Sequence, residues 1–361
     1  MDQQTMPTPV TKHARGAALW INLAIIYVVW GSTYFGIAIA IETMPPFLMS
    51  AIRFALAGSI LVALDLLRNP AARRLPTWRE LRDTFVVGAL LLGIGNGFVT
   101  FGEQTVPSGV AAILIAMIPL WFAVFGWVYF RQKLPRIVAG AVLLGFAGTA
   151  LLVAPAGDGA NSFDALGILV LLIAPIGWSH GSLYSAHRAK LPRSPWTASG
   201  LQMLAGASVT FTEALLTGEP SRFHPEAIST ASVLGVAYLV IFGSMVAFTA
   251  YAWLLKHAPL SLVGTYAYIN PIVAVSLGAL FLHEALSVRT VVASGIIILA
   301  VAIIVTARSR LGSKEPDAID AIDPSDQTAN GTSDHPSQRA AESPVTGARI
   351  RPAMPPRAPS G

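Results

Sequence analysis

The chain has 361 residues, of which 54% are hydrophobic and only 12% are charged, and its mean hydropathy is +0.61. So few charged residues cannot cover the surface of a water-soluble protein of this length, which excludes an ordinary soluble domain. The net charge of +5 would suit a nucleic-acid partner if it were gathered in one patch, and the lack of cysteine excludes disulfides and thiolate metal sites.

Ten apolar runs follow one another along the chain, each close to the roughly 20 residues that cross about 30 Å of hydrocarbon as a helix. In chain order they cover residues 18–38, 46–67, 83–101, 107–129, 137–155, 165–185, 196–217, 231–254, 259–282 and 288–307. The first run is longer than the apolar part of a secretory signal, which is about 7 to 15 residues. We therefore predict an all-α polytopic membrane protein with ten transmembrane helices and the lipid bilayer as its surroundings.

The basic residues fall almost entirely on one side of this arrangement. If the N-terminus is cytoplasmic, seventeen Lys and Arg residues lie in inside segments, and only Arg222 and Arg289 lie in outside loops. The positive-inside rule then predicts cytoplasmic N- and C-termini and explains the basic charge without nucleic acid. Residues 1–17 become a cytoplasmic N-terminal segment, and the Pro- and Ser-rich residues 308–361 become a disordered cytoplasmic tail.

The chain also contains a second copy of its first half, at an offset of about 150 residues. The matching positions are Gly31, Ser32 and Tyr34 with Gly181, Ser182 and Tyr184, and Pro107 and Pro119 with Pro259 and Pro271. The copies cover residues 18–155 and 156–307 with five runs each, so the second must enter the bilayer from the opposite side. Inverted repeats of this kind are typical of transporters, because they can form one site that opens to either face.

Four segments carry a family resemblance: WGSTYFGIAIAIETMPPFLMSAIRFALAG at 30–58, VPSGVAAILIAMIPLW at 106–121, QMLAG at 202–206 and TYAYINPIVAV at 265–275. They resemble the EamA family of the drug/metabolite transporter superfamily, in particular its YedA-like branch. The resemblance covers residues 18–307 and implies a ten-helix inner-membrane carrier with a central cavity between two EamA repeats. The copies differ at Gln132, where the first lacks the glutamate that Glu284 supplies in the second.

Polar and aromatic side chains stand near the middle of several runs, where a site between the copies would lie. The candidates for substrate binding are Trp30, Ser32 and Thr33 in the first run, Asn96 in the third, Trp178, His180 and Tyr184 in the sixth, and Tyr266, Tyr268 and Asn270 in the ninth. An aromatic and amide lining with few charges suits a small zwitterionic or amphipathic solute.

Two prolines, Pro119 and Pro271, lie near the middle of the fourth and ninth runs. Each removes a helix hydrogen bond and frees a carbonyl about four residues earlier. Free backbone groups at membrane depth are tolerated only inside protein or beside a wet cavity, so we expect helix breaks or gates facing the site. A packed kink without a role in transport is the alternative.

Arg53 is the one basic residue well inside a run, and burying it costs about 2.5–3.5 kcal/mol on insertion scales, so it needs a partner. Glu213 and Glu103 reach a similar depth, and we prefer a structural ion pair with them to a contact between Arg53 and the substrate. His180 leaves proton coupling open, because histidine titrates near neutral pH.

We predict a secondary transporter of the bacterial inner membrane that exports small metabolites, such as amino acids or related amphipathic solutes, by alternating access. An importer or a multidrug or dye efflux carrier of the same fold is the alternative, and an intramembrane enzyme is a remote one. No nucleophile elbow, phosphate loop or metal-binding motif occurs outside the apolar runs, so we expect neither a catalytic residue nor a cofactor nor a metal. The pattern leaves the oligomeric state open.

Overall fold

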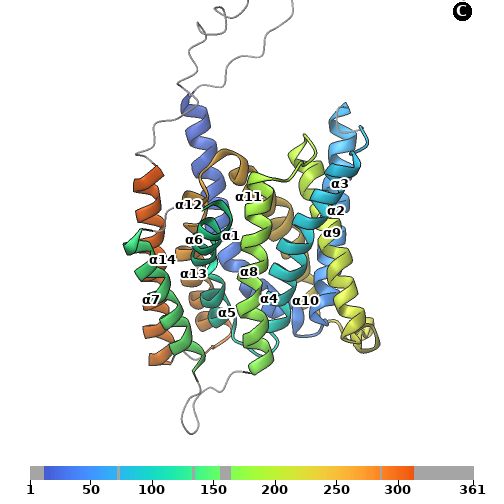
Figure 1. The fold of residues 1–361 in the computed structure, drawn as a ribbon. Coiled ribbons are helices and arrows are strands. Elements are labelled where there is room, and N and C mark those ends of the chain that lie inside the picture. Colours follow the sequence, from blue (N-terminus) through green and yellow to red (C-terminus); the bar gives the residue numbers. More distant parts are fainter. Residues whose placement is uncertain (1–11, 71–73, 132–134, 155–163, 285–286, 313–361) are drawn as a thin grey trace, which may run out of the picture. The chain divides into compact units, whose positions relative to one another are not determined.

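The computed structural model describes residues 12–70, 74–131, 135–154, 164–284 and 287–312 (Figure 1). Within these ranges the secondary structure is helical throughout, without a strand. Residues 1–11 of the predicted N-terminal segment and 313–361 of the predicted disordered tail lie outside the described residues, so both expectations stay predictions. All the helices discussed below belong to one compact unit.

The helices follow the predicted runs closely. The first copy contains α1 (Lys12–Ile41), α2 (Pro46–Arg68), α3 (Trp78–Gly88), the π-helix η2 (Ala89–Gly97), α4 (Phe98–Gly102), α5 (Ser108–Ile115), α6 (Ile118–Phe130) and α7 (Arg136–Val153). The second contains α8 (Ala165–His187), α9 (Pro195–Leu216), the 3-10 helices η3 (Glu219–Arg222) and η4 (Pro225–Ala227), α10 (Thr230–Tyr238), the π-helix η5 (Leu239–Val246), α11 (Ala247–His257), α12 (Leu260–Val263), α13 (Tyr266–Phe281) and α14 (Val288–Gly312).

Eight helical segments of the described chain are long and apolar enough to cross a membrane, and Tyr266–Phe281 is a shorter apolar helix. The all-helical membrane fold is therefore confirmed. The predicted count of ten spans is not settled by these criteria, because α9 is not among the eight and the ninth run is divided into α12 and α13.

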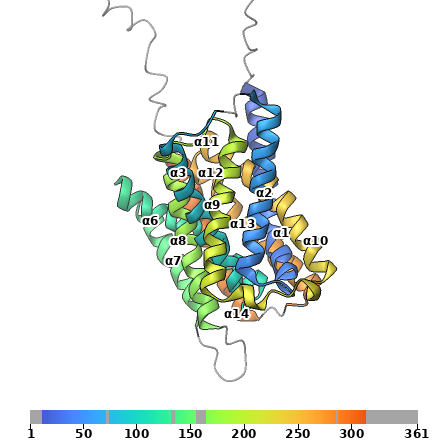
Figure 2. The same cartoon turned by 90° about the vertical axis from the view of Figure 1, so that its right-hand side faces the viewer.

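The two copies exchange their helices rather than lying side by side. The first helix of the first copy, α1, packs against α10, α11 and α13, whereas α8, the first helix of the second copy, packs against η2, α4 and α6. Two equivalent pairs close the bundle, α2 with α9 at one edge and α7 with α14 at the other (Figures 1 and 2). The space between the copies is thus bounded by helices from both.

Each helix of the α2–α9 pair receives a carboxylate from its partner at its N-terminal end. Asp65 near the end of α2 accepts hydrogen bonds from the backbone N–H of Thr197 at 3.1 Å and from its hydroxyl at 2.5 Å. Glu219, just after α9, accepts from the backbone N–H groups of Phe47 at 3.3 Å and Leu48 at 2.8 Å. Because the first turn of a helix has free N–H donors, each of these side chains supplies an acceptor for donors at the start of the partner helix.

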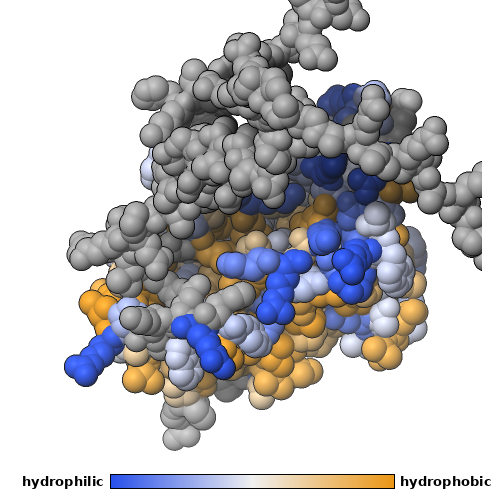
Figure 3. All heavy atoms as spheres, turned by 45° about the horizontal axis from the view of Figure 1, so that its top comes forward, coloured by the Kyte–Doolittle hydropathy of each residue, from blue (hydrophilic) through white to orange (hydrophobic). Residues whose placement is uncertain are grey.

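The flank of the bundle is apolar and exposed. Trp20, Val28, Leu143 and Leu299 are each more than half exposed, in helices that lie on the outside. In water such a surface would promote association, but in a bilayer it faces lipid. Figure 3 shows hydrophilic residues on the end of the bundle that faces the viewer and hydrophobic residues around the flank, where uncertain residues do not cover them.

Regular α-helix is interrupted at equivalent places in the two copies. The third run of each copy passes through a π-helical stretch, η2 in the first and η5 in the second. The fourth run of each is divided, α5 from α6 between Ile115 and Ile118, and α12 from α13 between Val263 and Tyr266. π-Helical stretches are rare and occur often at functional sites. We therefore expect the functional site in the space between these four interruptions.

Candidate functional site

A cavity lies between the two copies where the interrupted helices meet. Its space is about 620 Å³, counting the part that is open to solvent. The lining residues include Trp30, Thr33, Tyr34, Ile37, Arg53, Phe54, Asn96, Val99, Ile115 and Ile118 from the first copy and Ala174, Trp178, Met203, Gly243, Ser244, Phe248, Tyr266 and Asn270 from the second. Both copies therefore contribute to one site.

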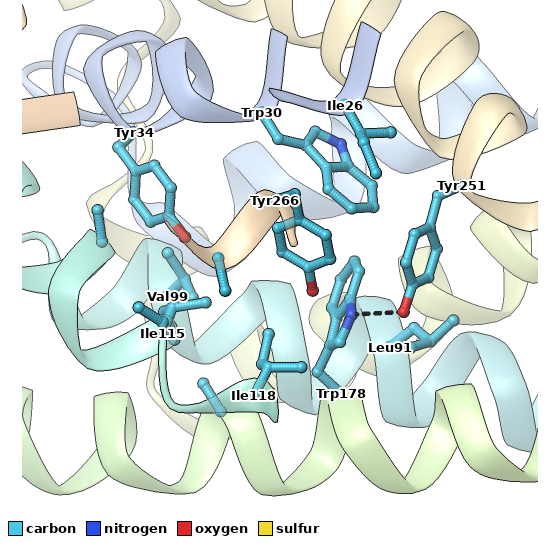
Figure 4. Packing of buried hydrophobic residues seen from close by; sticks show 14 of the residues in the cluster. Ile26, Trp30, Tyr34, Leu91, Val99, Ile115, Ile118, Trp178, Tyr251 and Tyr266 are labelled. Atoms are coloured by element: carbon cyan, nitrogen blue, oxygen red, sulfur yellow. Dashed lines mark hydrogen bonds between the residues drawn. The ribbon is translucent and has the colours of Figure 1, made fainter. Parts of the chain in front are cut away.

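Four aromatic side chains form a cluster at this cavity (Figure 4). The ring of Trp30 lies 5.3 Å from Trp178, 4.8 Å from Tyr251 and 5.4 Å from Tyr266, measured between centroids, and its contacts with Trp178 and Tyr266 are edge-to-face. Trp178 donates from Nε1 to the hydroxyl of Tyr251 at 3.1 Å, and Trp30 donates from Nε1 to the carbonyl oxygen of Gly243 at 3.2 Å. The indole rings are thus held in position by packing and by hydrogen bonds at once.

Two glycines make room for this arrangement. A Cβ atom built on Gly95 would lie 2.9 Å from Cε3 of Trp178, and one built on Gly243 would lie 3.0 Å from Nη2 of Arg53. Gly95 belongs to η2 and Gly243 to η5. The π-helical stretches therefore bring bare backbone against two large cavity side chains.

Arg53 joins the two π-helical stretches across the cavity. It lies on α2 with only 2% of its surface exposed, and it donates from Nε to the Ser244 hydroxyl at 2.8 Å and from Nη1 to Oδ1 of Asn96 at 3.3 Å. Its guanidinium also lies 4.9 Å from the ring centroid of Phe54. All these partners are neutral.

The expected ion pair of Arg53 with Glu213 or Glu103 is not formed in this conformation. Among the described residues, no carboxylate oxygen lies within 4.0 Å of the guanidinium. Both carboxyl oxygens of Glu103 and one of Glu213 are buried without a hydrogen bond, and neither residue lines the cavity. The neutral groups of Ser244 and Asn96 hold the guanidinium in place of a carboxylate.

Six of the ten predicted binding residues line this cavity. They are Trp30, Thr33, Asn96, Trp178, Tyr266 and Asn270. With its amide nitrogen facing the backbone, Asn270 donates to the carbonyl oxygens of Tyr266 at 3.2 Å and Tyr27 at 3.1 Å. The amide thereby satisfies carbonyls where α1 meets the start of α13.

The other four predicted binding residues point elsewhere. Ser32 shares a hydrogen bond with the Tyr238 hydroxyl, His180 with the Tyr129 hydroxyl at 2.6 Å, Tyr184 donates to Asp83, and Tyr268 donates to the carbonyl oxygen of Val301. None of these four residues lines the cavity. The hydroxyl of Tyr129 and the ring of Phe125, 4.2 Å from the imidazole centroid, account for His180 as a packed residue of the α6–α8 contact.

The prolines stand beside the cavity rather than in its lining. Pro119 occupies the first turn of α6, directly after the interruption that follows Ile115, and Pro271 lies inside α13, one residue after Asn270. Ile115 and Asn270 line the cavity. The chain around each proline thus reaches the site, although the proline rings do not.

Sequence reasoning missed several lining residues, among them Tyr34, Ser244 and Phe248, together with Tyr251 of the aromatic cluster. A helical spacing could have found them. Tyr34 stands four residues after Trp30, and Ser244, Phe248 and Tyr251 follow one another at intervals of four and three, so each set shares one helix face.

A further contact ties the copies together beside the site. Glu284, just after α13, accepts hydrogen bonds at 2.7 Å from the Ser108 backbone N–H and hydroxyl and at 3.0 Å from the Gly109 N–H, at the start of α5. The carboxylate thereby caps one of the broken helices that line the cavity. Gln132, its counterpart in the first copy, lies outside the described residues.

Comparisons with known proteins agree with this architecture. Residues 18–154 and 165–306 each match the EamA-like transporter family. The inner membrane transporter YedA of Escherichia coli (strain K12) is 38% identical over 284 residues, which cover 78% of this chain and 89% of the relative. The transporter YvbV of Bacillus subtilis (strain 168) is 26% identical, with 79% and 90% covered. A crystal structure that is 24% identical, with a TM-score of 0.59 over 82% of this chain and 99% of that one, shares the fold.

These matches span nearly all of the described helices, so they apply to the cavity as well as to the apolar flank. Relatives named as transporters point to a membrane transport protein rather than an enzyme. The apolar helices make the chain a multi-pass membrane protein. Since both halves match one family and a 38% identical relative is covered almost completely, the chain belongs to the EamA-like transporter family.

Proposed function

We propose that this protein is a secondary carrier that works by alternating access, with ten membrane-spanning helices arranged as two inverted five-helix repeats. The observation that carries the proposal is the cavity around Arg53 and the aromatic cluster, which both copies line, with η2 and η5 at equivalent positions around it. In inverted-repeat transporters, substrate sites lie at the repeat interface and are formed by interrupted helices. The divided fourth run of each copy supports this reading.

The solute is a small metabolite that leaves the cell, an amino acid or a related amphipathic compound. Aromatic rings, two amides and one guanidinium at the cavity support a solute with an apolar part and a polar part. The protein lies in a bacterial inner membrane with both termini in the cytoplasm. The similarity to YedA, which is named as an inner membrane transporter, and the one-sided distribution of basic residues support this placement.

Transport by the purified full-length chain in lipid vesicles tests the proposal. Uptake of amino acids, cationic dyes and sugars is measured with and without a pH gradient, and a solute that shows uptake is then tested for counterflow. A carrier saturates and supports counterflow, whereas a channel does not. Absence of saturable flux for every solute class would refute the proposal.

Two cavity variants connect the flux to this site. Trp30→Ala and Asn270→Ala should lower the flux at least tenfold without reducing the amount of folded protein, because each removes a buried contact at the cavity. Leu143→Ala is the matched control, since this side chain is 71% exposed on the outer flank of α7. If all three variants transport equally, the solute binds elsewhere.

A further inference from the structure

We infer that the cavity selects an organic monoanion, a carboxylate on an aromatic body, in preference to a zwitterion or a cation of the same shape. The inference rests on the proposed carrier function and, among the amphipathic solutes proposed there, selects acids without an amino group over amino acids. It assigns Arg53 as the residue that receives the carboxylate.

The described lining of the cavity contains one charged side chain. Among the described residues that line the cavity, Arg53 is the only one with a formal charge. No Asp or Glu stands in the lining, and Tyr, Trp, Ser, Thr and Asn supply the other polar groups. The wall of the site therefore carries a net positive charge, which attracts an anion and repels a cation.

The positive charge of Arg53 is not neutralised by a described residue. Arg53 is almost fully buried and makes its described hydrogen bonds to the neutral Ser244 and Asn96, without an ion pair to a described residue. A buried charge is costly unless it is paired and hydrogen-bonded. A guanidinium has five N–H donors, of which two are used in these bonds, so donors are left that suit a carboxylate.

The two carboxyl groups that were expected to pair with Arg53 stand outside the lining, Glu103 buried and Glu213 half-buried. Glu103 lies within electrostatic range of the guanidinium, and Glu213 reaches the backbone of Gly97 in η2, where a built Cβ would meet its Oε2 at 3.0 Å. Neither hydrogen-bonds to Arg53. A solute carboxylate in the cavity would touch the guanidinium directly, whereas Glu103 acts on it only at longer range.

The rest of the lining offers aromatic surface to the solute and no acidic group among the described residues. An ammonium group would find no carboxylate in the described lining, so only the aromatic faces would attract it, against the repulsion of Arg53. The rings of Trp30 and Trp178, with Tyr266 and Phe248, instead provide apolar surface for a flat ring. The lining thus favours an aromatic acid without an amino group.

Four probes of one shape test the inference on the unmodified protein: 3-phenylpropanoate, phenylalanine, 3-phenylpropylamine and 3-phenylpropanol. Binding to the full chain in lipid nanodiscs is followed by quenching of tryptophan fluorescence, because Trp30 and Trp178 lie in the lining. We expect the propanoate to bind at least tenfold more tightly than each of the others. Equal or tighter binding of the amine or of phenylalanine, or binding of none of the four, would overturn the inference.

Variants then connect the preference to Arg53. Arg53→Gln should abolish the preference for the acid over the alcohol, and Arg53→Lys should retain part of it. Glu103→Gln is the control, because removing a competing carboxylate should leave acid binding unchanged or tighter. If Arg53→Gln does not fold, the comparison of Glu103→Gln with the unmodified protein still decides, since weaker acid binding by Glu103→Gln would contradict the charge argument.

The carrier function and the solute class fail in different ways. If the alcohol or the amine is carried with counterflow and the acid is not, the carrier function stands and the monoanion inference is refuted. If neither the amino acid, dye and sugar panel nor any of the four phenyl probes shows saturable flux, the carrier function itself is refuted.

Discussion

Gly95→Ala changes the cavity by a single methyl group. The added Cβ would lie 2.9 Å from Cε3 of Trp178, whereas carbon atoms at optimal separation lie about 3.5–4.0 Å apart. The indole must therefore retreat by roughly 0.6–1 Å if the backbone stays in place. The Trp178 ring is also held by its hydrogen bond to Tyr251 and by its edge-to-face contact with Trp30, and these contacts restrict its movement.

The expected cost follows from overpacking. Inserting a methyl group into a well-packed core typically costs about 1–3 kcal/mol, and the helix-favouring effect of alanine offsets up to about 1 kcal/mol of it. The part of this strain that solute binding increases would weaken binding, by up to roughly 150-fold for 3 kcal/mol, and the part that is already present in the free protein lowers its thermal midpoint. We expect a lower initial rate of counterflow, a lower thermal midpoint in detergent and a changed tryptophan emission.

Gly140→Ala provides the matched comparison, because a Cβ on Gly140 meets nothing within 4 Å. Gly140 lies in α7, and Gly295 in α14 is equally open, so both substitutions should leave flux unchanged and raise the thermal midpoint slightly. If Gly95→Ala behaves like these two in both flux and midpoint, the packing argument for Trp178 is wrong.

Three further predictions concern carboxylates that tie the copies together. Asp65→Ala leaves the buried Thr197 donors without their acceptor and should cost about 1–3 kcal/mol of unfolding free energy, with a smaller loss for Asp65→Asn, measured as thermal midpoints. Glu284→Gln keeps one acceptor oxygen for the start of α5 at Ser108, so flux should fall by less than with Glu284→Ala; equal rates for both would contradict the capping role. Burial raises the pKa of Glu219, although two backbone N–H groups partly oppose this. Its contribution to stability is therefore full below about pH 4.3 and lost as pH rises through the folded pKa, and Glu219→Gln should gain in midpoint relative to the unmodified protein between pH 5 and pH 8.

Hydropathy was sufficient to predict the helices, because a segment in lipid must satisfy its backbone internally and must also be apolar. Each of the ten predicted runs begins and ends close to one described helix or to two or three consecutive ones. The interruptions were harder to predict. Pro119 marks the start of α6, but Gly264 and Thr265 separate α12 from α13 several residues before Pro271, and no residue type announces η2 or η5.

The candidate site shows the same contrast on a smaller scale. Ser32, His180 and Tyr268 each stand two residues after a lining residue, which turns a helical side chain about 200° away. Thr33 and Asn270 stand three and four residues after Trp30 and Tyr266 and share their faces. Selecting residues only by their depth in the membrane therefore gave too many candidates. Requiring each candidate to share a face with the lining aromatic residue of its own helix would have excluded Ser32, His180 and Tyr268.

The contacts that organise the site could not be predicted from hydropathy or from helical spacing. Arg53 meets Ser244 from 191 residues away, and Glu284 meets Ser108 from 176 residues away. The position of Arg53 well inside its run predicted that it needs a partner. Glu103 and Glu213 were chosen because they stand at a similar depth in their own runs. Ser244 and Asn96, which lie in the π-helical stretches, hydrogen-bond to the guanidinium instead. Glu103 and Glu213 are not among the lining residues. Because a neutral partner satisfies hydrogen bonds without cancelling charge, this rearrangement changes an expected structural ion pair into a positively charged wall, and with it the kind of solute that the cavity favours.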